Sequence, residues 1–236
     1  DLHVTEHSFP TRRSSDLDGS YVFTGVPAGN YTVTETQPNG FLDGKDSGGN
    51  SGGTVTNDRV ANISLPAGES TPVTGVNFGE QLPAKLSGFV YVDAGDDGVR
   101  GAGETPIAGV TVTLSGTDNL GAPVTATTTT NAQGFYEFVG LRPGTYTVTE
   151  TQPGAFNDGK DTAGTTGGNA GNDVISSITL GSGENSQNNN FGERPKTNTI
   201  AGVVFEDKDN DGVQGAGEPG IPGATVTLQG TDTNGN

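Results

Sequence analysis

A long internal repeat is the feature that most narrows the folds open to this chain. Residues 18–38 align with residues 133–153 without a gap, and both stretches end in Tyr-Thr-Val-Thr-Glu-Thr-Gln-Pro. The tetrapeptide Asn-Phe-Gly-Glu follows at 77–80 and again at 190–193, so the two copies stand about 115 residues apart. Recurrence at one spacing is typical of modules that fold alike and stand in tandem.

The repeat divides the chain into four parts. We expect a complete unit at 85–195, preceded by the back part of a unit at 18–84 and followed by the front part of another at 196–236. The joints between them are short, so neighbouring units should lie close together. Residues 1–17 do not follow the pattern and are interpreted as a non-native, adaptor-derived tail, with a genuine leader or linker as the alternative.

Within 85–195 the apolar residues recur with a period of two. Val110, Val112 and Leu114, for example, alternate with Thr and Ser. Such alternation, bounded by Gly, Pro and Asn, is typical of half-buried strands. We expect about seven strands, at 87–92, 108–115, 123–130, 135–139, 144–150, 174–180 and 187–192. The pattern predicts an all-β antiparallel sandwich in tandem repeats, with 153–173 as a long functional or mobile loop.

Charge and composition exclude several classes of function. The chain has 28 acidic against 11 basic residues, a net charge of -17, and a pI of about 4.2. This field repels nucleic acid and anionic membranes and attracts cations. There is no Cys, both His residues lie in the suspect tail, and no nucleophile–base pair can be assembled. We therefore expect no enzyme, no nucleic-acid partner and no membrane insertion in this fragment.

Residues 207–218 have the spacing of a loop that wraps around one calcium ion. Oxygen donors stand at loop positions 1, 3, 5, 7 and 12, supplied by Asp207, Asp209, Asp211, the Val213 carbonyl and Glu218. Gly212 at position 6 permits the tight turn. An acidic, solvated turn is the alternative. The spacing favours a Ca2+ site on a β scaffold, since no flanking helices are expected.

The same frame recurs in the complete unit with one ligand missing. Positions 1, 5, 7 and 12 are held by Asp93, Asp97, Val99 and Glu104. Position 3 is Gly95, and Asp96 at position 4 is the residue that could replace the missing ligand. We expect calcium here too, bound more weakly, because affinity follows the number of charged ligands.

A second acidic set lies in the long loops and gives weaker metal candidates. Its members match between the copies: Asp43, Asp46 and Asp58 in the first, and Asp158, Asp161 and Asp173 in the second. These carboxylates converge only if the Gly-rich loop folds back. Lys45 and Lys160 would oppose a cation, so solvated loop charge is an equal alternative.

Several motifs in fixed order resemble a known family. They are Ser-Gly-Phe-Val-Tyr-Val-Asp at 87–93, Gly-Phe-Tyr-Glu-Phe at 134–138, Pro-Gly-Thr-Tyr-Thr-Val-Thr-Glu at 143–150 and Asn-Phe-Gly-Glu at 190–193. Together with the acidic loop they resemble the B-repeat domains of serine-aspartate repeat surface proteins, within the wider collagen-adhesin B-type group. The resemblance implies an immunoglobulin-like (prealbumin-like) sandwich in calcium-binding stalk repeats. It also implies further calcium sites in loops such as 153–173.

In the wider collagen-adhesin group, a Glu at the position of Glu150 promotes a Lys–Asn isopeptide bond. That chemistry needs a Lys on the first strand, and 88–93 contains none. We therefore expect no isopeptide bond, and we interpret Glu150 as a hydrogen-bonding residue at a strand end.

These observations favour a non-catalytic, calcium-stiffened spacer of a bacterial cell-surface or secreted protein. Its partners would be neighbouring repeats of the same chain, with any extracellular host or matrix ligand bound through other domains. The alternative is a carbohydrate- or protein-ligand-binding module, which needs an exposed aromatic platform. Alternation puts Tyr136 and Phe138 out of phase with Phe135, so we expect these rings and Tyr146 to pack in the core.

Overall fold

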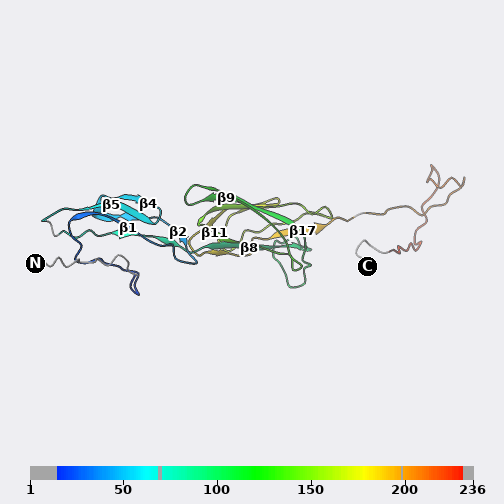
Figure 1. Cartoon of the computed structure of the whole chain (residues 1–236). Helices are drawn as coiled ribbons and strands as arrows, with labels where there is room; N and C mark the ends of the chain where they lie inside the picture. The colour runs from blue at the N-terminus through cyan, green and yellow to red at the C-terminus, as the bar shows by residue number, and fades with distance from the viewer. Residues whose placement is uncertain (1–14, 69–70, 198, 231–236) are drawn as a thin grey trace, which may run out of the picture. The chain divides into compact units, whose positions relative to one another are not determined.

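The computed structural model describes residues 15–68, 71–197 and 199–230, and its chain path is drawn in Figure 1. Two units are distinguished, Asp1–Pro195 and Lys196–Asn236. All the strands described belong to the first unit. In the described part of the second unit, regular pairing is limited to one bridge between Phe205 and Gly220. Of the predicted tail, residues 1–14 lie outside the described residues.

One sheet of the complete repeat has five antiparallel strands in the order β10-β9-β12-β15-β14. Their bounds are Thr111–Asp118 for β9, Pro123–Thr129 for β10, Gly144–Glu150 for β12, Asn169–Gly171 for β14 and Val174–Leu180 for β15. The Thr-rich side chains of β10 alternate between half-buried and exposed. Such a strand suits the edge of a sheet that covers a core on one face only.

The second sheet follows the order β11-β8-β17-β13, with β16 also pairing with β8. Its bounds are Ala84–Val92 for β8, Phe135–Leu141 for β11, Phe156–Asp158 for β13, Asn185–Ser186 for β16 and Phe191–Pro195 for β17. Both β16 and β17 run parallel to β8, which departs from the predicted all-antiparallel pairing. The chain reaches these strands by crossing over from β15 in the other sheet. Antiparallel pairing is required only where a tight hairpin joins two neighbouring strands, so a crossover allows parallel pairing.

The core of the repeat lies between these two sheets and confirms the predicted all-β sandwich class. Tyr136, Phe138 and Tyr146 are buried there, as expected from their alternation. The remaining buried apolar side chains are Ala84, Leu86, Val90, Val110, Val112, Leu114, Leu141, Val148, Ile175, Ile178, Leu180 and Phe191.

A β-bulge explains the irregular apolar pattern near 175–180. The register between β12 and β15 shifts by one residue, and Ser177 there has a φ of 58°. The extra residue lets Ile175 and Ile178 both face the core although they are three positions apart. The first copy repeats the device at Asn62 on β5 (Arg59–Leu65), with a φ of 58°.

The interval 153–173, for which no strand was predicted, contains the two short strands β13 and β14. β13 pairs with β17, and β14 pairs with β15. Each strand has only three residues, which is too short to show alternation in the sequence. These pairings fold the loop back onto the edges of both sheets, and this is what positions its carboxylates.

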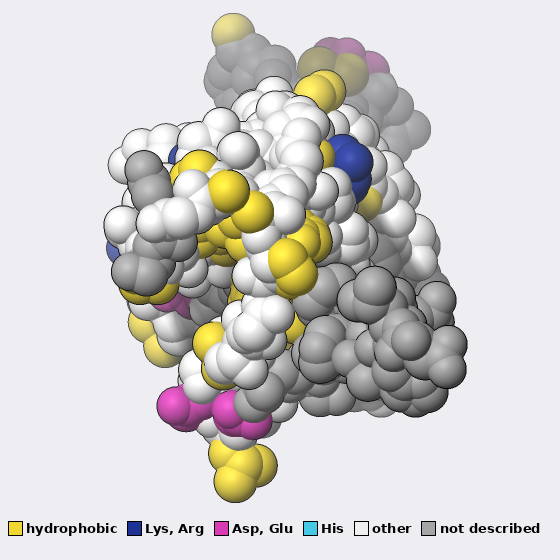
Figure 2. All heavy atoms as spheres, turned by 60° about the vertical axis from the view of Figure 1, so that its left-hand side comes forward, with side chains coloured by type: hydrophobic (Ala, Val, Ile, Leu, Met, Phe, Trp, Pro, Cys, Tyr) yellow, Lys and Arg dark blue, Asp and Glu magenta, His cyan; other side chains and the backbone are white. Residues whose placement is uncertain are grey.

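The first partial repeat keeps the corresponding pieces. A three-stranded sheet has the order β1-β5-β4, and the two-stranded pairs are β2-β7 and β3-β6. Their bounds are Gly29–Thr34 (β1), Leu42–Asp43 (β2), Ser47–Gly48 (β3), Thr54–Thr56 (β4), Val76–Asn77 (β6) and Glu80–Gln81 (β7), with a short 3-10 helix at Gly49–Ser51. Apolar side chains show on the face in Figure 2, and Val22, Phe41 and Val55 of this part are exposed.

Candidate metal centres

The loop at 207–218 is organised around the carboxylate of its first residue. The two oxygens of Asp207 accept hydrogen bonds from the main-chain N–H groups of Asp211 (3.2 Å) and Gly212 (2.9 Å). Asp211 in turn accepts one from Val213 N (2.7 Å). Gly212 has a φ of 77°, the left-handed turn for which glycine is suited.

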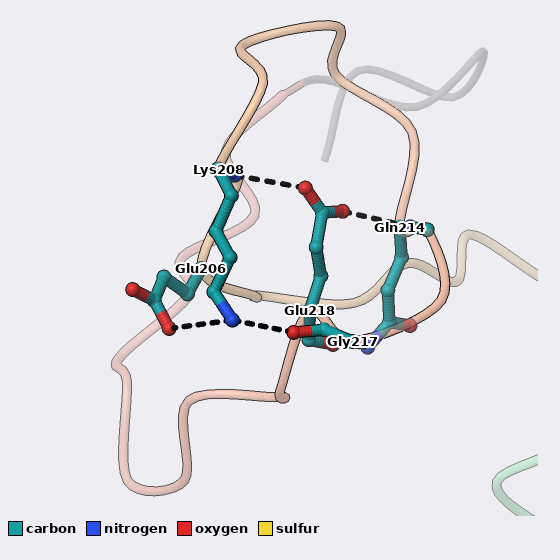
Figure 3. A network of polar contacts seen from close by, with 6 residues as sticks. Glu206, Lys208, Gln214, Gly217 and Glu218 are labelled. Atoms are coloured by element: carbon teal, nitrogen blue, oxygen red, sulfur yellow. Dashed lines mark hydrogen bonds and ion pairs between the residues drawn. The ribbon is translucent and has the colours of Figure 1, made fainter.

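Glu218 closes this loop from the other end, as Figure 3 shows. Its two oxygens accept hydrogen bonds from Lys208 N (2.8 Å) and Gly215 N (2.7 Å). These bonds, that from Gly215 first, lower the pKa of Glu218 and keep it ionised. Carboxylate oxygens of Asp207, Asp209 and Glu218 lie within 4.8 Å of one another. The Lys208 ammonium instead donates to Gly217 O (2.6 Å) and lies 4.0 Å from Glu206.

The loop at 93–104 has the same internal network. Asp93 accepts from the N–H groups of the residues four and five positions later, at 3.2 and 2.7 Å. The remaining bonds of the set run from Val99 N to Asp97 (2.8 Å) and from Gly101 N to Glu104 (2.8 Å). Two loops in different units therefore fold alike, which indicates that the local sequence dictates this geometry.

The missing ligand at position 3 leaves the carboxylates of the 93–104 loop farther apart than those of the 207–218 loop. Among the described residues, the trios of carboxylates that meet within 4.8 Å include none from 93–104. Asp96, the residue that could replace the missing ligand, joins no such trio among the described residues. Its carboxylate pairs with Arg194 at 3.4 Å, and its φ of 53° sets it in a left-handed turn. Asp93 itself is fully buried.

A third group of carboxylates is buried at the edge of the sandwich. It consists of Glu150 at the end of β12, Asp173 before β15 and Glu193 on β17, with one oxygen from each lying within 4.8 Å of the others. Glu150 is 4% exposed and Glu193 is fully buried. Both oxygens of Glu150 and one each of Asp173 and Glu193 have no hydrogen-bond partner. Nearby Asp158 and Asp161 each add another unpartnered oxygen.

The electrostatics of this buried cluster oppose ionisation. Burial raises the pKa of Glu150 strongly, and the charges of Glu193 and Asp161 raise it further. Burial and then the charge of Asp158 raise the pKa of Asp161 to about 8, although a hydrogen bond from Gly192 N acts in the opposite direction. A cation in the cluster would offset both the burial and the mutual repulsion.

Glu150 does end β12, as interpreted from the sequence. Its buried carboxyl group faces that of Glu193 and accepts no hydrogen bond from a main-chain N–H group. Glu193 was not considered from the sequence at all. The premise that the first strand lacks Lys is also wrong, since β8 begins at Ala84 and includes Lys85. The Lys85 side chain is exposed, however, whereas Glu150 is buried. The available signal was recurrence, because Glu150 and Glu193 have counterparts in the first copy.

That first copy gathers its carboxylates in the same way. Glu35, Asp58 and Glu80 meet within 4.8 Å, and so do Asp43, Asp46 and Asp58. The Gly-rich loop of the first copy therefore folds back, which is the condition stated above for its carboxylates to come together. Asp46 accepts from Gly79 N (3.3 Å), as Asp161 accepts from Gly192 N (3.2 Å) in the second copy.

Lys45 and Lys160 were expected to oppose a cation. The ion pairs between described residues include those of Arg194 with Asp96 and of Lys208 with Glu206. Neither Lys45 nor Lys160 neutralises the carboxylates of its loop by ion pairing.

No helix in the described ranges is long and apolar enough to cross a membrane.

The fold and these centres define an all-β repeat domain with carboxylate-lined loops. Residues 84–193 match the sequence profile of the SdrD B-like domain, and this stretch is such a domain, which confirms the resemblance. Among curated relatives, serine-aspartate repeat-containing protein F of Staphylococcus epidermidis is 32% identical over 232 residues, covering 94% of this chain and 12% of that protein.

Two further relatives come from Staphylococcus aureus. Serine-aspartate repeat-containing protein E (strain USA300) is 33% identical over 224 residues, covering 91% of this chain and 18% of that protein. Bone sialoprotein-binding protein (strain MRSA252) is 32% identical over 224 residues, covering 91% of this chain and 19% of that protein. The chain therefore spans less than a fifth of each of these relatives.

Solved structures with some similarity include pilins. The minor pilin GBS52 of Streptococcus agalactiae is 15% identical with a TM-score of 0.33, over 58% of this chain and 61% of that one. A variant of the shaft pilin SpaA of Lactobacillus rhamnosus GG is 20% identical with a TM-score of 0.29, over 50% of each chain.

Proposed function

We propose that this chain is a calcium-binding, non-catalytic spacer segment of a bacterial surface or secreted protein, in which calcium stiffens each repeat. The observation that carries the proposal is the buried cluster of Glu150, Asp173 and Glu193. Both oxygens of Glu150 and one oxygen each of Asp173 and Glu193 lack a hydrogen-bond partner, while the other oxygens of Asp173 and Glu193 accept from Asn172 and Gln152. Buried, unpaired carboxylates cost free energy unless a proton or a cation neutralises them.

The residues present fit a hard cation. Every side-chain donor in the clusters is a carboxylate oxygen, and calcium takes six to eight oxygen ligands in flexible geometry. In the complete repeat, Glu150, Asp173, Glu193 and Asp161 would hold one ion, and the 93–104 loop would hold a second. In the second unit, Asp207, Asp209 and Glu218 would hold another. Bound calcium supplies positive charge, and it favours the folded chain because the unfolded chain has no formed site.

The proposed setting is the outside of a bacterial cell. Similarity to serine-aspartate repeat-containing proteins supports it, as does the tandem arrangement of the units. One relative is named for binding bone sialoprotein, and this chain spans 19% of it. We assign any such host ligand to other domains of the parent protein, with neighbouring repeats as the partners of this segment.

Thermal unfolding of the full chain, with calcium and with a chelator, tests the proposal. Calcium at about 100 times its Kd stabilises a one-site protein by about 2.7 kcal/mol. Since 1 kcal/mol moves the Tm of a domain this small by roughly 4–8 °C, we expect a rise of at least about 10 °C. An unchanged midpoint would sink the proposal.

Glu150→Gln gives the matched variant, because it removes a candidate ligand at nearly constant shape. We expect little change of the Tm in chelator, since the raised pKa of Glu150 already favours its neutral form, and a smaller rise with calcium than in the parent chain. Glu137→Gln on β11 is the control, since Glu137 is exposed and lies in none of the clusters. It should leave both midpoints unchanged.

The ligand-binding alternative is supported by one aromatic pair. The rings of Phe89 and Phe135 lie 5.3 Å apart, half-buried, beside a shallow groove that Asn185 and Gln187 also line. The Arg100 guanidinium lies 4.0 Å from the Phe89 ring centre and occupies one of its faces. Binding on a glycan array that is lost in Phe135→Ala would favour this alternative, whereas a flat array favours the spacer.

A further inference from the structure

The two candidate centres of the complete repeat share strand β17. Asp93, the first residue of the 93–104 loop, donates its N–H to the carbonyl of Glu193 (2.8 Å). The side chain of that same Glu193 belongs to the buried cluster. The preceding residue, Gly192, donates its N–H to Asp161 (3.2 Å) and packs on Asp93, where an added Cβ would lie 3.3 Å from Oδ2. Two consecutive residues thus contact both centres.

The segment at 160–162 makes a second connection. Thr162 donates its hydroxyl to the carbonyl of Gly98 at position 6 of the loop (2.5 Å), while its neighbour Asp161 stands beside the cluster. Gly98 has a φ of 76°, and a Cβ there would lie 2.8 Å from the Thr162 hydroxyl. The loop turn therefore fits against this segment with no room for a side chain. Thr162 is itself held to Asn190 by paired main-chain hydrogen bonds of 2.9 Å.

We infer that the 93–104 loop and the Glu150–Asp173–Glu193 cluster bind calcium as a coupled pair, each site tightening the other. The inference rests on the proposed function and concerns how its sites communicate. A calcium ion that neutralises one set of carboxylates lowers the electrostatic repulsion on the other set. An ion in the cluster also restrains β17 and residues 160–162, and these segments contact the 93–104 loop and would order it. The coupling is reciprocal by linkage, and couplings of this kind are typically about 5- to 150-fold in affinity.

The 207–218 loop supplies an internal control. It repeats the hydrogen-bond network of 93–104, but it belongs to the second unit. In the described part of that unit, the trio of carboxylates that meet is the loop's own. Its calcium binding should therefore be independent of the buried cluster.

Hydrogen exchange of the full chain, followed by mass spectrometry during a calcium titration, tests the coupling. Peptides covering 93–104 and 207–218 report the two loops separately. In the double variant Glu150→Gln, Glu193→Gln, the calcium midpoint for protection of 93–104 should rise at least about fivefold. The midpoint for 207–218 should stay within twofold. A 93–104 midpoint that also stays within twofold overturns the inference.

Thr162→Val keeps every carboxylate and removes one connection. It should raise the 93–104 midpoint by a smaller factor, and it decides the question if the double variant fails to fold. An unchanged midpoint in a folded Thr162→Val chain also overturns the coupling. If calcium protects neither loop in the parent chain, the proposed function fails instead. If calcium protects both loops but the substitutions leave the 93–104 midpoint unchanged, the coupling is contradicted and the proposed function is not.

Discussion

At the scale of single residues, one position separates the two calcium-type loops. Their internal hydrogen bonds agree, but position 3 is Asp209 in one and Gly95 in the other. Asp209 stands in a trio of carboxylates within 4.8 Å, and in the described ranges the 93–104 loop forms no such trio. The difference in ligand charge is therefore the feature that should set the two affinities apart.

Gly95→Asp should tighten calcium binding by the 93–104 loop about tenfold, by restoring the missing carboxylate. The site has room, since the nearest atom to an added Cβ is an Asp97 oxygen at 3.8 Å. The calcium midpoint for hydrogen-exchange protection of 93–104 measures the effect. Asp209→Gly is the mirror-image control and should weaken the 207–218 loop. If neither Gly95→Asp nor Asp209→Gly changed the calcium midpoint of its own loop, this explanation of the difference in affinity would be contradicted.

At the scale of elements, the sequence predicts what is local and misses what the topology assembles. The strands expected at 144–150 and 174–180 coincide with β12 and β15, because alternation and flanking turns define them. β13 and β14 are too short for such a signal. The first strand begins at Ala84 instead of residue 87, so Lys85 was left outside it.

The same distinction separates the candidate sites. Within each of the loops 93–104 and 207–218, all candidate ligands lie in a stretch of twelve residues, so their spacing in the sequence was enough to predict them. Glu150, Asp173 and Glu193 come from three separate parts of the sandwich, and sheet pairing brings them together. Of these three, Asp173 was a weak candidate from its acidic loop. The other two stand in β12 and β17, outside the acidic loops, where no spacing rule applies.

The bulge in β15 gives a prediction at this scale. Ser177 has a φ of 58°, a backbone conformation that Asn tolerates well and β-branched residues do not. Asn62 occupies the same place in the first copy. We expect Ser177→Asn to stabilise the chain by up to about 0.5 kcal/mol and Ser177→Val to destabilise it by about 1–3 kcal/mol.

Urea unfolding at fixed calcium measures both free energies. Thr179→Val is the matched control, because it lies on the same strand, is also exposed, and is not among the residues with positive φ. It should change stability by less than about 0.5 kcal/mol. A Ser177→Val chain as stable as the control would show that the bulge is not held in this conformation.

At the scale of the whole molecule, the crowded carboxylates make stability depend on pH. Burial first, then neighbouring charge, raises the pKa of Asp161 to about 8 and that of Glu35 to about 7. Groups whose pKa is higher in the folded chain stabilise it below their unfolded pKa, and this contribution is lost as pH rises through the folded value. In chelator, the Tm should therefore fall between about pH 5 and pH 8.

Calcium should flatten or reverse that fall, since it binds the deprotonated carboxylates and replaces their protons. Differential scanning calorimetry at several pH values, with chelator and with saturating calcium, checks both halves. Asp207 and Glu218 have lowered pKa values, owing to main-chain hydrogen bonds, and stay ionised across this window. A Tm that rises with pH in chelator would contradict the assignment of Asp161 and Glu35.

The contact between consecutive repeats in the first unit includes hydrogen bonds to neutral acceptors. Arg142, in the turn between β11 and β12, donates to the carbonyl of Asp43 (2.6 Å), and its own carbonyl accepts from the Tyr146 hydroxyl (2.7 Å). Leu82 N also donates to the Ser182 hydroxyl (2.8 Å). These groups are neutral acceptors and main-chain donors, apart from Arg142 itself, so removing calcium should leave them in place.

Arg142→Ala should therefore speed hydrogen exchange around β2 by about tenfold in chelator, a loss of about 1.4 kcal/mol of local protection. Arg100→Ala is the control, because Arg100 stacks on Phe89 and makes no recorded contact with Asp43. Equal exchange in both variants would mean that the joint is held by the short linker alone. A large effect of chelator on the parent chain at β2 would instead tie the joint to calcium, and would extend the stiffening from single repeats to the contact between them.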